Sequence, residues 1–551
     1  MKEKIVEILS KKLKIKEDEI ENLLEIPPSL EIGDYAFPCF ALSKLFKKPP
    51  NEIASELQKE LVKKIPGSIE KLESKGAYLN FFIKKEIFAK EVFSKALENN
   101  YGSENQKEKI LIEHTSVNPN ASPHVGRARN SIIGDSLVRI LKFLGNKVEI
   151  HYYVNDVSKQ IAMLALVYKK GQTFDDMLNN YINISRKIEN NKNLEKQVFL
   201  LLEKLESGDK KTIELFNKIV SICVNGQKNI FEKFNIYFDS FDYESKYLGW
   251  KSRNILKKLE ATGKVFLDSA GRKVLNLNHT NLIKKMKSPV FVLTRSNGTG
   301  LYGLRDIAYT IEKLKFGRNI IVLGEDQKLY FEQISEAIKL LGYNPPEVVH
   351  YSFVLIQNDN SKTTRKMSTR RGELVLLEEF FEEAVTKADI EIKKRETKGD
   401  SKKVAIAAIK YAMLKNDLNK NIIFSWDTSL NFEGDSGPYL QYSYARASSI
   451  LRKFDSKDTK YKIPNLAISE IKLIKKISEF PEIVKVAGRR LNPSLIANYS
   501  FQLAKSFNEF YHENKVINSK EENFRIKIVE AFRNTLRNSL YLLGIEVMEE
   551  M

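Results

Sequence analysis

The stretch KILIEHTSVNPNASPHVGRARNSIIGDSLVRILKFLG, residues 109–145, decides the fold of this chain. Its first residues are apolar and β-branched, which is typical of a short buried strand. Its last part ends at Gly145, a common left-handed helix cap. That part carries apolar residues at helical spacing: Ile132, Ile133, Leu137, Ile140, Leu141 and Leu144. The stretch therefore predicts a strand, a loop and a helix of an α/β domain.

The loop between this strand and this helix is rich in polar residues, proline and glycine. It contains Asn118, Pro119, Asn120, Pro123, His124, Gly126 and Arg127. The free N–H groups and the positive dipole end of a helix start bind phosphate. The same strand, loop and helix occur in most doubly wound domains, so this segment alone leaves a purely structural interpretation open.

Length, charge and cysteine content limit the class of protein. A chain of 551 residues predicts about three or four domains. It contains no run of eighteen apolar residues, and its charged start is unlike a signal peptide, so we expect a soluble, intracellular protein. Cys39 and Cys223 are isolated in the sequence, which favours two buried thiols over a metal site or a disulfide. The net charge of +19 favours a polyanionic partner, although an overall bias towards lysine would also produce it.

Residues 1 to about 100 predict a separate domain of mixed helix and strand. The segment GAYLNFFI, residues 76–83, has the alternation of a strand. If Leu79 and Phe81 face inward, Tyr78 and Asn80 are exposed on the other face. Tyr78 would then stack on an unpaired base and Asn80 would bond its edge. An ordinary sheet face is the alternative.

The segment KVEIHYYVND, residues 147–156, predicts a second strand that completes a βαβ unit and hence a parallel sheet. Residues 158 to about 237 have a helical pattern and many charges. Strands resume at PVFVLTR, residues 289–295. We interpret the range 158–288 as a helical insertion between two halves of one sheet.

A turn at residues 296–300 precedes a helix on which Tyr302 and Asp306 lie four residues apart, and so on one face. A carboxylate beside a phenol suits a planar guanidinium. A solvent-exposed aspartate near a helix start is the alternative. The following segment, residues 319–327, predicts a buried strand that brings Asp326 and Gln327 to the carboxyl edge of the sheet, where ligands of open α/β sheets bind.

Two further segments are basic. Five cations fall within ten residues, and a loop of this kind would neutralise a triphosphate: Lys362, Arg365, Lys366, Arg370 and Arg371. A basic surface loop without a role is the alternative. From about residue 437 the pattern is helical, basic and rich in aromatic residues, which suits unpaired RNA as well as ordinary core packing.

Taken together, these motifs resemble the class I aminoacyl-tRNA synthetases, and the arginyl-tRNA synthetase family in particular. HVGR, residues 124–127, is similar to the family's HIGH box, and KMST, residues 366–369, to its KMSKS loop. GEDQ, residues 324–327, resembles the ribose-side motif. DSGPYLQYSYARASSIL, residues 435–451, resembles the start of the helical anticodon-binding domain. Residues 1 to about 100 resemble the N-terminal domain that contacts the tRNA elbow in this family.

The resemblance implies a role for individual residues. Asn118 and Gln327 would hold the α-groups of arginine, while Glu113, Tyr302 and Asp306 would face its guanidinium. The predicted catalytic and ATP-binding residues are His124, Gly126, Arg127, Asp326, Lys366, Met367 and Ser368. The HIGH region comprises Val117, Asn118, Pro119, Asn120, Ala121, Ser122, Pro123, His124, Val125, Gly126 and Arg127. Tyr78 and Asn80 would bind tRNA, and no metal-ligating residue is predicted.

Three positions depart from the family pattern. Arg127 replaces the second histidine of the HIGH box, and Thr369 replaces the second lysine of the KMSKS loop. In family members that lack this lysine, another just upstream of the HIGH box substitutes for it, but here that position is Ala121. The missing charge would come from Arg365, Arg370 or Arg371, and the sequence does not distinguish among them.

The resemblance implies an α/β fold: a Rossmann-like parallel-sheet catalytic domain with a helical insertion (residues 105–435), an N-terminal α+β domain (1–104) and a C-terminal all-α helical bundle (436–551). It implies a ligase that activates L-arginine with ATP and Mg²⁺, without a permanently bound cofactor, and charges the tRNA for arginine. We expect a cytoplasmic monomer without membrane contact that needs tRNA for activation. The alternatives are a class I synthetase of another specificity and a non-catalytic tRNA-binding relative.

Overall fold

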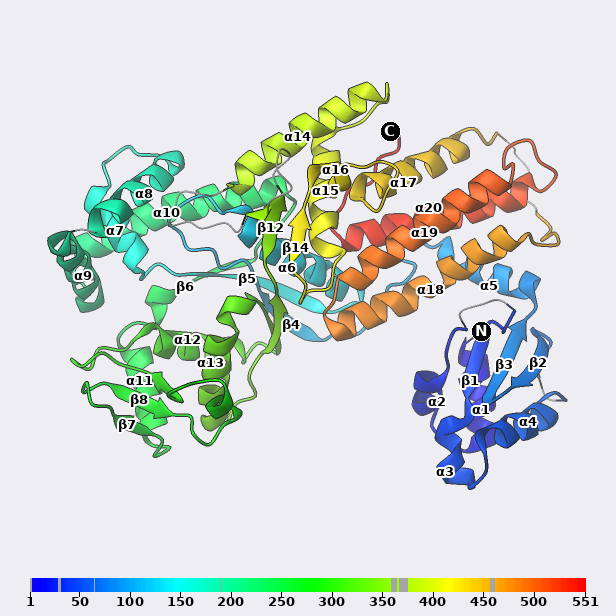
Figure 1. The fold of residues 1–551 in the computed structure, drawn as a ribbon, viewed down its shortest axis with the longest axis horizontal. Helices are drawn as coiled ribbons and strands as arrows, with labels where there is room; N and C mark the ends of the chain where they lie inside the picture. The colour runs from blue at the N-terminus through cyan, green and yellow to red at the C-terminus, as the bar shows by residue number, and fades with distance from the viewer. Residues whose placement is uncertain are drawn as a thin grey trace. The chain divides into compact units, whose positions relative to one another are not determined.

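The computed structural model describes residues 2–27, 31–63, 65–189, 191–357, 364–365, 375–455 and 461–551 (Figure 1). These residues form two compact units. The first comprises Met1–Tyr101, Ala447–Glu479 and Lys505–Thr535, and the second comprises Gly102–Arg446, Phe480–Ala504 and Leu536–Met551. None of the helices within the described ranges has both the length and the apolar character needed to span a membrane.

The N-terminal part of the first unit is a three-stranded antiparallel sheet with helices. The sheet has the order β1-β3-β2, and Leu72 and Leu79 lie in its buried core. The elements are α1 (Lys2–Leu13), α2 (Glu17–Leu23), β1 (Tyr35–Pro38), η1 (Cys39–Leu42), α3 (Ser43–Phe46), α4 (Pro50–Leu61), β2 (Ile69–Lys75), β3 (Tyr78–Ile83) and α5 (Lys85–Ala96).

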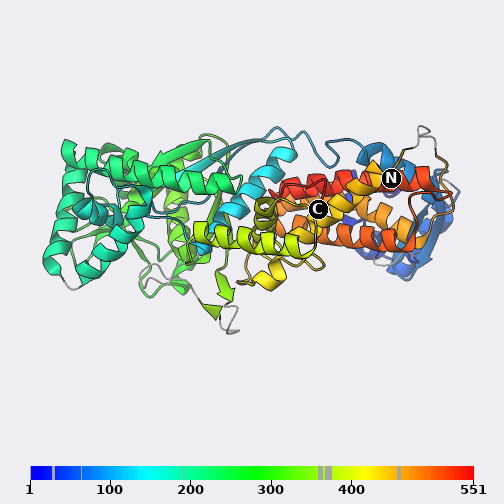
Figure 2. The same ribbon diagram turned by 90° about the horizontal axis from the view of Figure 1, so that it is seen from above.

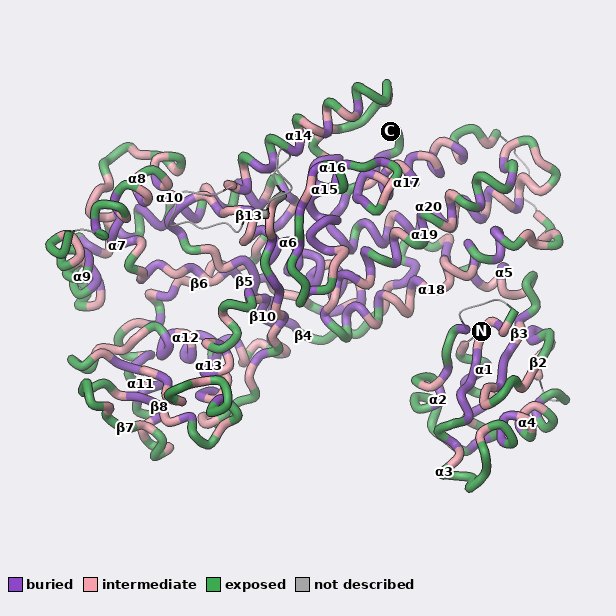
Figure 3. Tube along the Cα trace, in the orientation of Figure 1, coloured by how far each residue is buried: buried purple, intermediate pink, exposed green. Residues whose placement is uncertain are grey.

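The second unit is built on a five-stranded, wholly parallel sheet with the order β11-β10-β4-β5-β6. The predicted strand, loop and helix of residues 109–145 are β4 (Lys109–Glu113) and α6 (Val125–Phe143), and β5 (Lys147–Val154) completes the βαβ unit. The sheet also contains β6 (Ser240–Tyr243), β10 (Arg318–Gly324) and β11 (Glu347–Tyr351). Its central strands β4 and β10 are buried (Figure 3). The predicted parallel sheet is confirmed.

The range 158–288 contains more than helices, so our interpretation of it as a helical insertion is corrected. Its helices are α7 (Lys159–Val167), α8 (Phe174–Glu189), α9 (Lys192–Ser207) and α10 (Lys210–Lys233). The strand β6 follows and pairs with β5. Its four residues, SFDY, are all half-buried, and this short polar pattern gave no strand signal.

The strand predicted at residues 289–295 also lies outside the parallel sheet. It is β9 (Val290–Val292), which forms a small antiparallel sheet with β7 (Val265–Leu267) and β8 (Lys273–Asn276). Around this sheet lie η2 (Glu244–Tyr247), α11 (Trp250–Glu260) and η3 (Asn281–Lys284). The chain then continues through α12 (Tyr302–Lys313), η4 (Glu325–Gln327) and α13 (Lys328–Leu340). The helices α12 and α13 share a core with Ile321 of β10.

The second unit continues with a third small sheet, in which β12 (Val354–Gln357) pairs with β13 (Thr364–Arg365) and β14 (Ile422–Phe424). Its helices are α14 (Leu377–Lys394), α15 (Ser401–Leu414) and α16 (Trp426–Ser429). Four long helices follow, and each of them has one part in the first unit and one part in the second (Figures 1 and 2). They are α17 (Gly437–Arg452), α18 (Ile468–Arg490), α19 (Ser494–Glu513) and α20 (Glu522–Leu542), and the predicted all-α C-terminal region is confirmed.

Candidate active site

The side-chain amide of Asn130 on α6 fixes the start of the loop that joins β4 to α6. Thr115 and Ser116 have φ values of 79° and 43°, a conformation that costs free energy for non-glycine residues. The Asn130 side-chain oxygen accepts a hydrogen bond from the Thr115 N–H at 2.6 Å, and its amide nitrogen donates to the Val322 carbonyl at 2.8 Å. Asn130 therefore ties the strained start of the loop to β10.

His114 fills the space beneath this loop. Its Nδ1 lies 2.8 Å from Thr115 Oγ1, and burial lowers its pKa to about 4, so the ring is neutral at pH 7. A Cβ atom on Gly134 of α6 would lie 2.2 Å from Cγ of His114. Glycine is therefore required at this point of α6 for the close packing against His114.

We expect Gly134→Ala to lower the free energy of unfolding by about 2–3 kcal/mol, because the added methyl group must displace a fully buried ring. Urea unfolding monitored by circular dichroism measures it. Gly67→Ala is the matched control, because a Cβ atom on Gly67 would meet nothing within 4 Å. Equal stability of the two variants would contradict the packing role of Gly134.

The predicted HIGH region lies beside the chain that follows the basic loop. His124 is the N-cap residue of α6 and forms an isolated antiparallel bridge with Leu376. The Val125 N–H donates to the Val375 carbonyl at 3.0 Å, and the Leu377 N–H donates to the Pro123 carbonyl at 2.8 Å. The start of α6 is thus joined directly to the end of the segment that contains KMST.

His124 is neutral at pH 7, because burial and the nearby Arg127 lower its pKa to about 4. Its Nδ1 is buried and has no hydrogen-bond partner among the described residues. Lys366, Met367, Ser368, Thr369, Arg370 and Arg371 lie outside the described residues, and of Arg365 only the backbone is described, in β13.

The second motif, GEDQ, lies at the carboxyl end of β10, as predicted. A Cβ atom on Gly324 would lie 2.4 Å from Asp326 Oδ1, so glycine makes room for this carboxylate. The Gln327 amide donates to Asp326 at 3.2 Å. Asp326 is exposed and Gln327 half-buried.

Asp306 is the centre of a small polar cluster. Its Oδ1 accepts a hydrogen bond from the Tyr153 hydroxyl at 2.9 Å, and its Oδ2 accepts one from Tyr330. The ring centroid of Tyr302 lies 5.3 Å from that of Tyr330, and Tyr302 is 52% exposed. Burial raises the pKa of Asp306 although both hydroxyl groups lower it. A partly buried carboxylate held by two tyrosines beside an exposed phenol is thus available for a cationic ligand.

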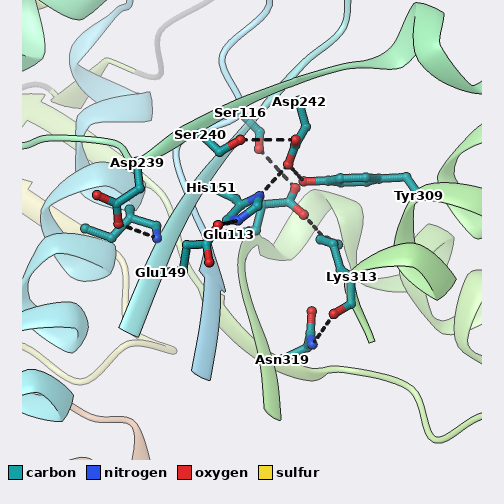
Figure 4. A network of polar contacts seen from close by, with 11 residues as sticks. Glu113, Ser116, Glu149, His151, Asp239, Ser240, Asp242, Tyr309, Lys313 and Asn319 are labelled. Carbon is teal, nitrogen blue, oxygen red and sulfur yellow. Dashed lines mark hydrogen bonds and ion pairs between the residues drawn. The ribbon is translucent and has the colours of Figure 1, made fainter. Parts of the chain in front are cut away.

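Glu113 is paired within the protein. Its Oε2 forms an ion pair with Lys313, and its Oε1 accepts from Ser116 Oγ at 3.3 Å (Figure 4). Glu113 and Lys313 are both buried, and the Lys313 ammonium lies 4.1 Å from the centroid of the Tyr309 ring. The predicted contact of Glu113 with a guanidinium stays a prediction.

Gln227 of α10 fixes the middle of the HIGH region. Its amide nitrogen donates to the carbonyls of Asn118 and Ala121, both at 2.9 Å. The Tyr152 hydroxyl lies 2.8 Å from Gln227 Oε1 and 2.9 Å from the Val117 carbonyl oxygen. The Asn118 side chain itself is exposed, whereas Ala121 is buried. Gln227 thereby presents the Asn118 side chain outward.

Sequence reasoning missed Gln227, Tyr153 and Tyr330. A glutamine on the apolar face of an amphipathic helix is a detectable signal, since Cys223 and Ile230 on the same helix are buried as well. Tyr153 and Tyr330 gave no signal, because their partner Asp306 is far away in the sequence.

The structure contradicts part of the prediction that Tyr78 and Asn80 are exposed on the N-terminal strand β3. Tyr78 of β3 is half-buried, and its ring packs edge-to-face on Phe40 with centroids 5.6 Å apart. Asn80 is only 1% exposed, so the predicted exposure is wrong. The chain at Gly33 covers it, since a Cβ atom there would lie 3.4 Å from Asn80 Cβ.

The described residues contain no group of three or more His, Cys, Asp or Glu side chains arranged to hold a metal ion. Cys39 and Cys223 are both buried free thiols, as expected. Burial raises the pKa of Cys39 to about 11 and that of Cys223 to about 12, so neither is a reactive thiolate at pH 7.

Three family models match successive parts of the chain. Residues 1–83 match the arginyl tRNA synthetase N terminal domain, and residues 440–551 match the DALR anticodon binding domain. Residues 91–426, more than half of the chain, match the catalytic domain of the class I tRNA synthetases (R). The chain belongs to the arginyl-tRNA synthetase family.

Relatives within this family match over the whole chain. The arginine–tRNA ligase of Clostridium perfringens is 33% identical over 578 residues, covering 100% of both proteins. That of Methanocaldococcus jannaschii is 35% identical and covers 96% of this chain and 95% of the relative. The solved structure of Thermus thermophilus arginyl-tRNA synthetase aligns with a TM-score of 0.82 at 27% identity and covers 100% of this chain and 99% of that chain. The predicted fold class is thereby confirmed.

Proposed function

We propose that this member of the arginyl-tRNA synthetase family activates L-arginine with ATP and transfers it to the terminal adenosine of its tRNA, with Asp306 as the carboxylate that recognises the guanidinium. The observation that carries the proposal is the Asp306 cluster, in which the hydroxyl groups of Tyr153 and Tyr330 hold one carboxylate. Burial makes the ionised carboxylate costly, and a bound cation would offset that cost.

Arginine would lie between α12 and the carboxyl edge of the parallel sheet. Its planar guanidinium pairs best with two carboxylate oxygens at once, which neither an ammonium nor a neutral side chain does. Tyr302 would cover the guanidinium. The exposed Asn118 and the half-buried Gln327 would hold the α-amino and α-carboxyl groups.

ATP, as its Mg²⁺ complex, would lie at the start of α6. A neutral His124 has one N–H to donate to a phosphate and adds no charge of its own. Gly126 lets the backbone approach the nucleotide, and Asp326 would accept from the ribose hydroxyls. Lys366, Met367 and Ser368 would belong to the segment that closes on the phosphates.

The reaction has two steps. The arginine carboxylate oxygen attacks the α-phosphorus of ATP in line, a bond to that phosphorus forms, and pyrophosphate leaves with the bridging oxygen. A ribose hydroxyl of the tRNA then attacks the carbonyl carbon of the arginyl-adenylate, and AMP leaves. Catalysis comes mainly from positioning and from cations directed at the developing phosphate charge.

Three substitutions distinguish this chain from the family pattern: Arg127, Thr369 and Ala121. Arg127 keeps a cation at the start of α6. Burial raises the pKa of the nearby Tyr351 hydroxyl, and the charge of Arg127 partly opposes this rise. Ala121 is buried and carries no charge. Arg365, Arg370 and Arg371 remain the candidates for the missing charge.

The tRNA would bind the basic C-terminal helices and, through Tyr78, the N-terminal sheet. The net charge of +19 predicts a strong salt dependence of this binding. The domain boundaries 1–104, 105–435 and 436–551, the monomeric state and the cytoplasmic location stay predictions of the sequence analysis.

The test is the exchange of pyrophosphate into ATP with each of the twenty amino acids, with and without tRNA. Among the twenty amino acids, we expect only arginine to support exchange. This exchange should require the presence of tRNA. Exchange with a different amino acid would indicate another class I specificity. Salt-sensitive tRNA binding without exchange would indicate a non-catalytic relative, and strong exchange without tRNA would contradict the tRNA requirement.

A further inference from the structure

A polar network on one face of the parallel sheet joins β4, β5, β6 and α12 (Figure 4). His151 of β5 lies in register with Glu113 of β4 and with Ser240 of β6. Residues paired in a parallel sheet, and residues two apart along a strand, point to the same face. Glu149, His151 and Tyr153 of β5 therefore share one face of the sheet with the Asp242 side chain.

His151 lies between two carboxylates. Its Nδ1 is 2.5 Å from Asp242 Oδ2, and its Nε2 is 3.0 Å from Glu149 Oε1. Both partners accept hydrogen bonds and have none to donate when ionised, whereas a neutral imidazole carries only one N–H. Only the protonated ring satisfies both contacts, since deprotonation would set a nitrogen lone pair against a carboxylate.

A continuous series of contacts leads from His151 to the candidate arginine site. Asp242 Oδ2 also accepts a hydrogen bond from the Tyr309 hydroxyl at 2.9 Å. The Tyr309 ring is stacked on the Tyr153 ring, with centroids 4.6 Å apart and an interplanar angle of 20°. The Tyr153 hydroxyl in turn donates to Asp306. Displacement of Asp242 would thus move Tyr309, then Tyr153, and finally the hydrogen bond to Asp306.

Two further cations near this network, Lys313 and Lys246, pair with another carboxylate or act only weakly on Asp242. On β4 and α12, Glu113 is paired with Lys313, whose ammonium lies over the Tyr309 ring. Lys246 of η2 also lowers the pKa of Asp242, but its effect is smaller than that of the hydrogen bonds from His151 and Tyr309. His151 is therefore the main cation that acts on Asp242.

We propose that protonated His151 is a positioning residue that, through Asp242, Tyr309 and Tyr153, holds Asp306 in the orientation that binds the guanidinium of arginine. The inference rests on the proposed contact between arginine and Asp306. It predicts that the affinity for arginine depends on a histidine that does not touch the substrate.

The predicted consequence is a pH dependence of arginine binding. Burial lowers the pKa of His151, but its hydrogen bonds and charge interactions with Asp242 and Glu149 outweigh burial and raise it above 6.5. The two carboxylate contacts favour the protonated ring, which loses its proton as the pH rises through this raised pKa. KM for arginine should rise above the pKa of His151, while KM for ATP changes less.

The test compares three variants with the wild type in tRNA-supported pyrophosphate exchange between pH 6 and 9. Glu149→Gln keeps the fold, because Glu149 is half-exposed, but it removes one charge that favours the imidazolium. The pH at which KM for arginine rises should move down by about half a unit or more. His151→Gln should raise KM for arginine about tenfold at pH 7 and flatten its pH dependence. His279→Gln is the control, since His279 is an exposed histidine of the same unit, and it should match the wild type.

Stability provides a second measurement. Because the pKa of His151 is higher in the folded than in the unfolded protein, its contribution to stability is fully present below about pH 6.5 and is lost as the pH rises through the folded pKa. Glu149→Gln brings the pKa of His151 closer to its unfolded value. The free energy of unfolding should therefore fall less between pH 6 and 9 in this variant than in the wild type.

The inference is overturned if Glu149→Gln and His279→Gln give the same pH dependence of KM for arginine as the wild type. A misfolded His151→Gln protein leaves that comparison intact. The arginine α-amino group titrates equally in all variants, so it cannot produce a difference between them. A failure of the Asp306 assignment is recognised separately, because Asp306→Asn would then leave KM for arginine unchanged.

Discussion

Asp306→Asn is expected to lower kcat/KM for arginine by about 10²–10³-fold, because an amide cannot accept hydrogen bonds from two guanidinium nitrogens at once and lacks the charge that faces them. One of the hydroxyl groups of Tyr153 and Tyr330 would still donate to the remaining side-chain oxygen, and the other would instead accept from the new amide N–H, so the side chain would move little. The measurement is arginine-dependent pyrophosphate exchange in the presence of tRNA.

The control for this prediction is Glu312→Gln on the same helix. Glu312 is an exposed residue that pairs with Lys251, and its loss should leave kcat/KM for arginine within about twofold. KM for ATP should be similar in both variants, because the proposed nucleotide site lies at the start of α6. Unchanged arginine affinity in Asp306→Asn would remove the basis of the proposed recognition.

Asp135→Asn is expected to lower the free energy of unfolding by about 3–5 kcal/mol, because it leaves a buried ammonium without its counter-charge. Asp135 of α6 lies 3.0 Å from the ammonium of Lys410 on α15, whose side chain is 0% exposed. Arg139 contacts the same carboxylate at 3.0 Å. A Cβ atom on Gly544 would lie 2.4 Å from Lys410 Nζ, so the C-terminal segment closes over this pair.

The buried pair of Asp135 and Lys410 predicts that the protein loses stability at low pH. Burial raises the pKa of Asp135, but Lys410 and Arg139 outweigh burial, so its pKa is lowered from 3.8. Its contribution to stability is therefore present above about pH 3.8 and is lost as the pH falls through the folded pKa. Urea unfolding at several pH values measures it.

The double variant Asp135→Leu with Lys410→Met is the informative control for the second prediction. Replacing both partners of a buried pair by apolar groups costs far less than removing one of them. The double variant should therefore be more stable than Asp135→Asn alone. Equal stability of Asp135→Asn and the wild type would show that Lys410 does not depend on this carboxylate.

The local pattern predicted most elements correctly, because the side chains that decide them are near one another in the sequence. Ile132 and Leu137 are buried at helical spacing in α6, and Ile110 and Ile112 are buried in β4. The pattern failed at β6, where four half-buried residues form a strand only because β5 lies beside them. It failed at Asn80 because the chain at Gly33, distant in the sequence, covers that face.

In the candidate site, too, the sequence predicted the local contacts and missed the distant ones. The spacing of Tyr302 and Asp306 on one helix predicted a carboxylate beside a phenol, and the structure places Tyr330 between them. No local signal connects Asp306 with Tyr153, or Asp242 with His151, because these residues are brought together by the order of the strands.

By itself the sequence determined the element types, the parallel βαβ unit at residues 109–154 and the motifs of the family, since periodicity and short motifs are local properties. Only the tertiary structure decided which side chains surround Asp306, how Lys313 pairs with Glu113 and where His151 finds its two carboxylates. Such contacts depend on strand order and register, and these are set by packing across the whole domain.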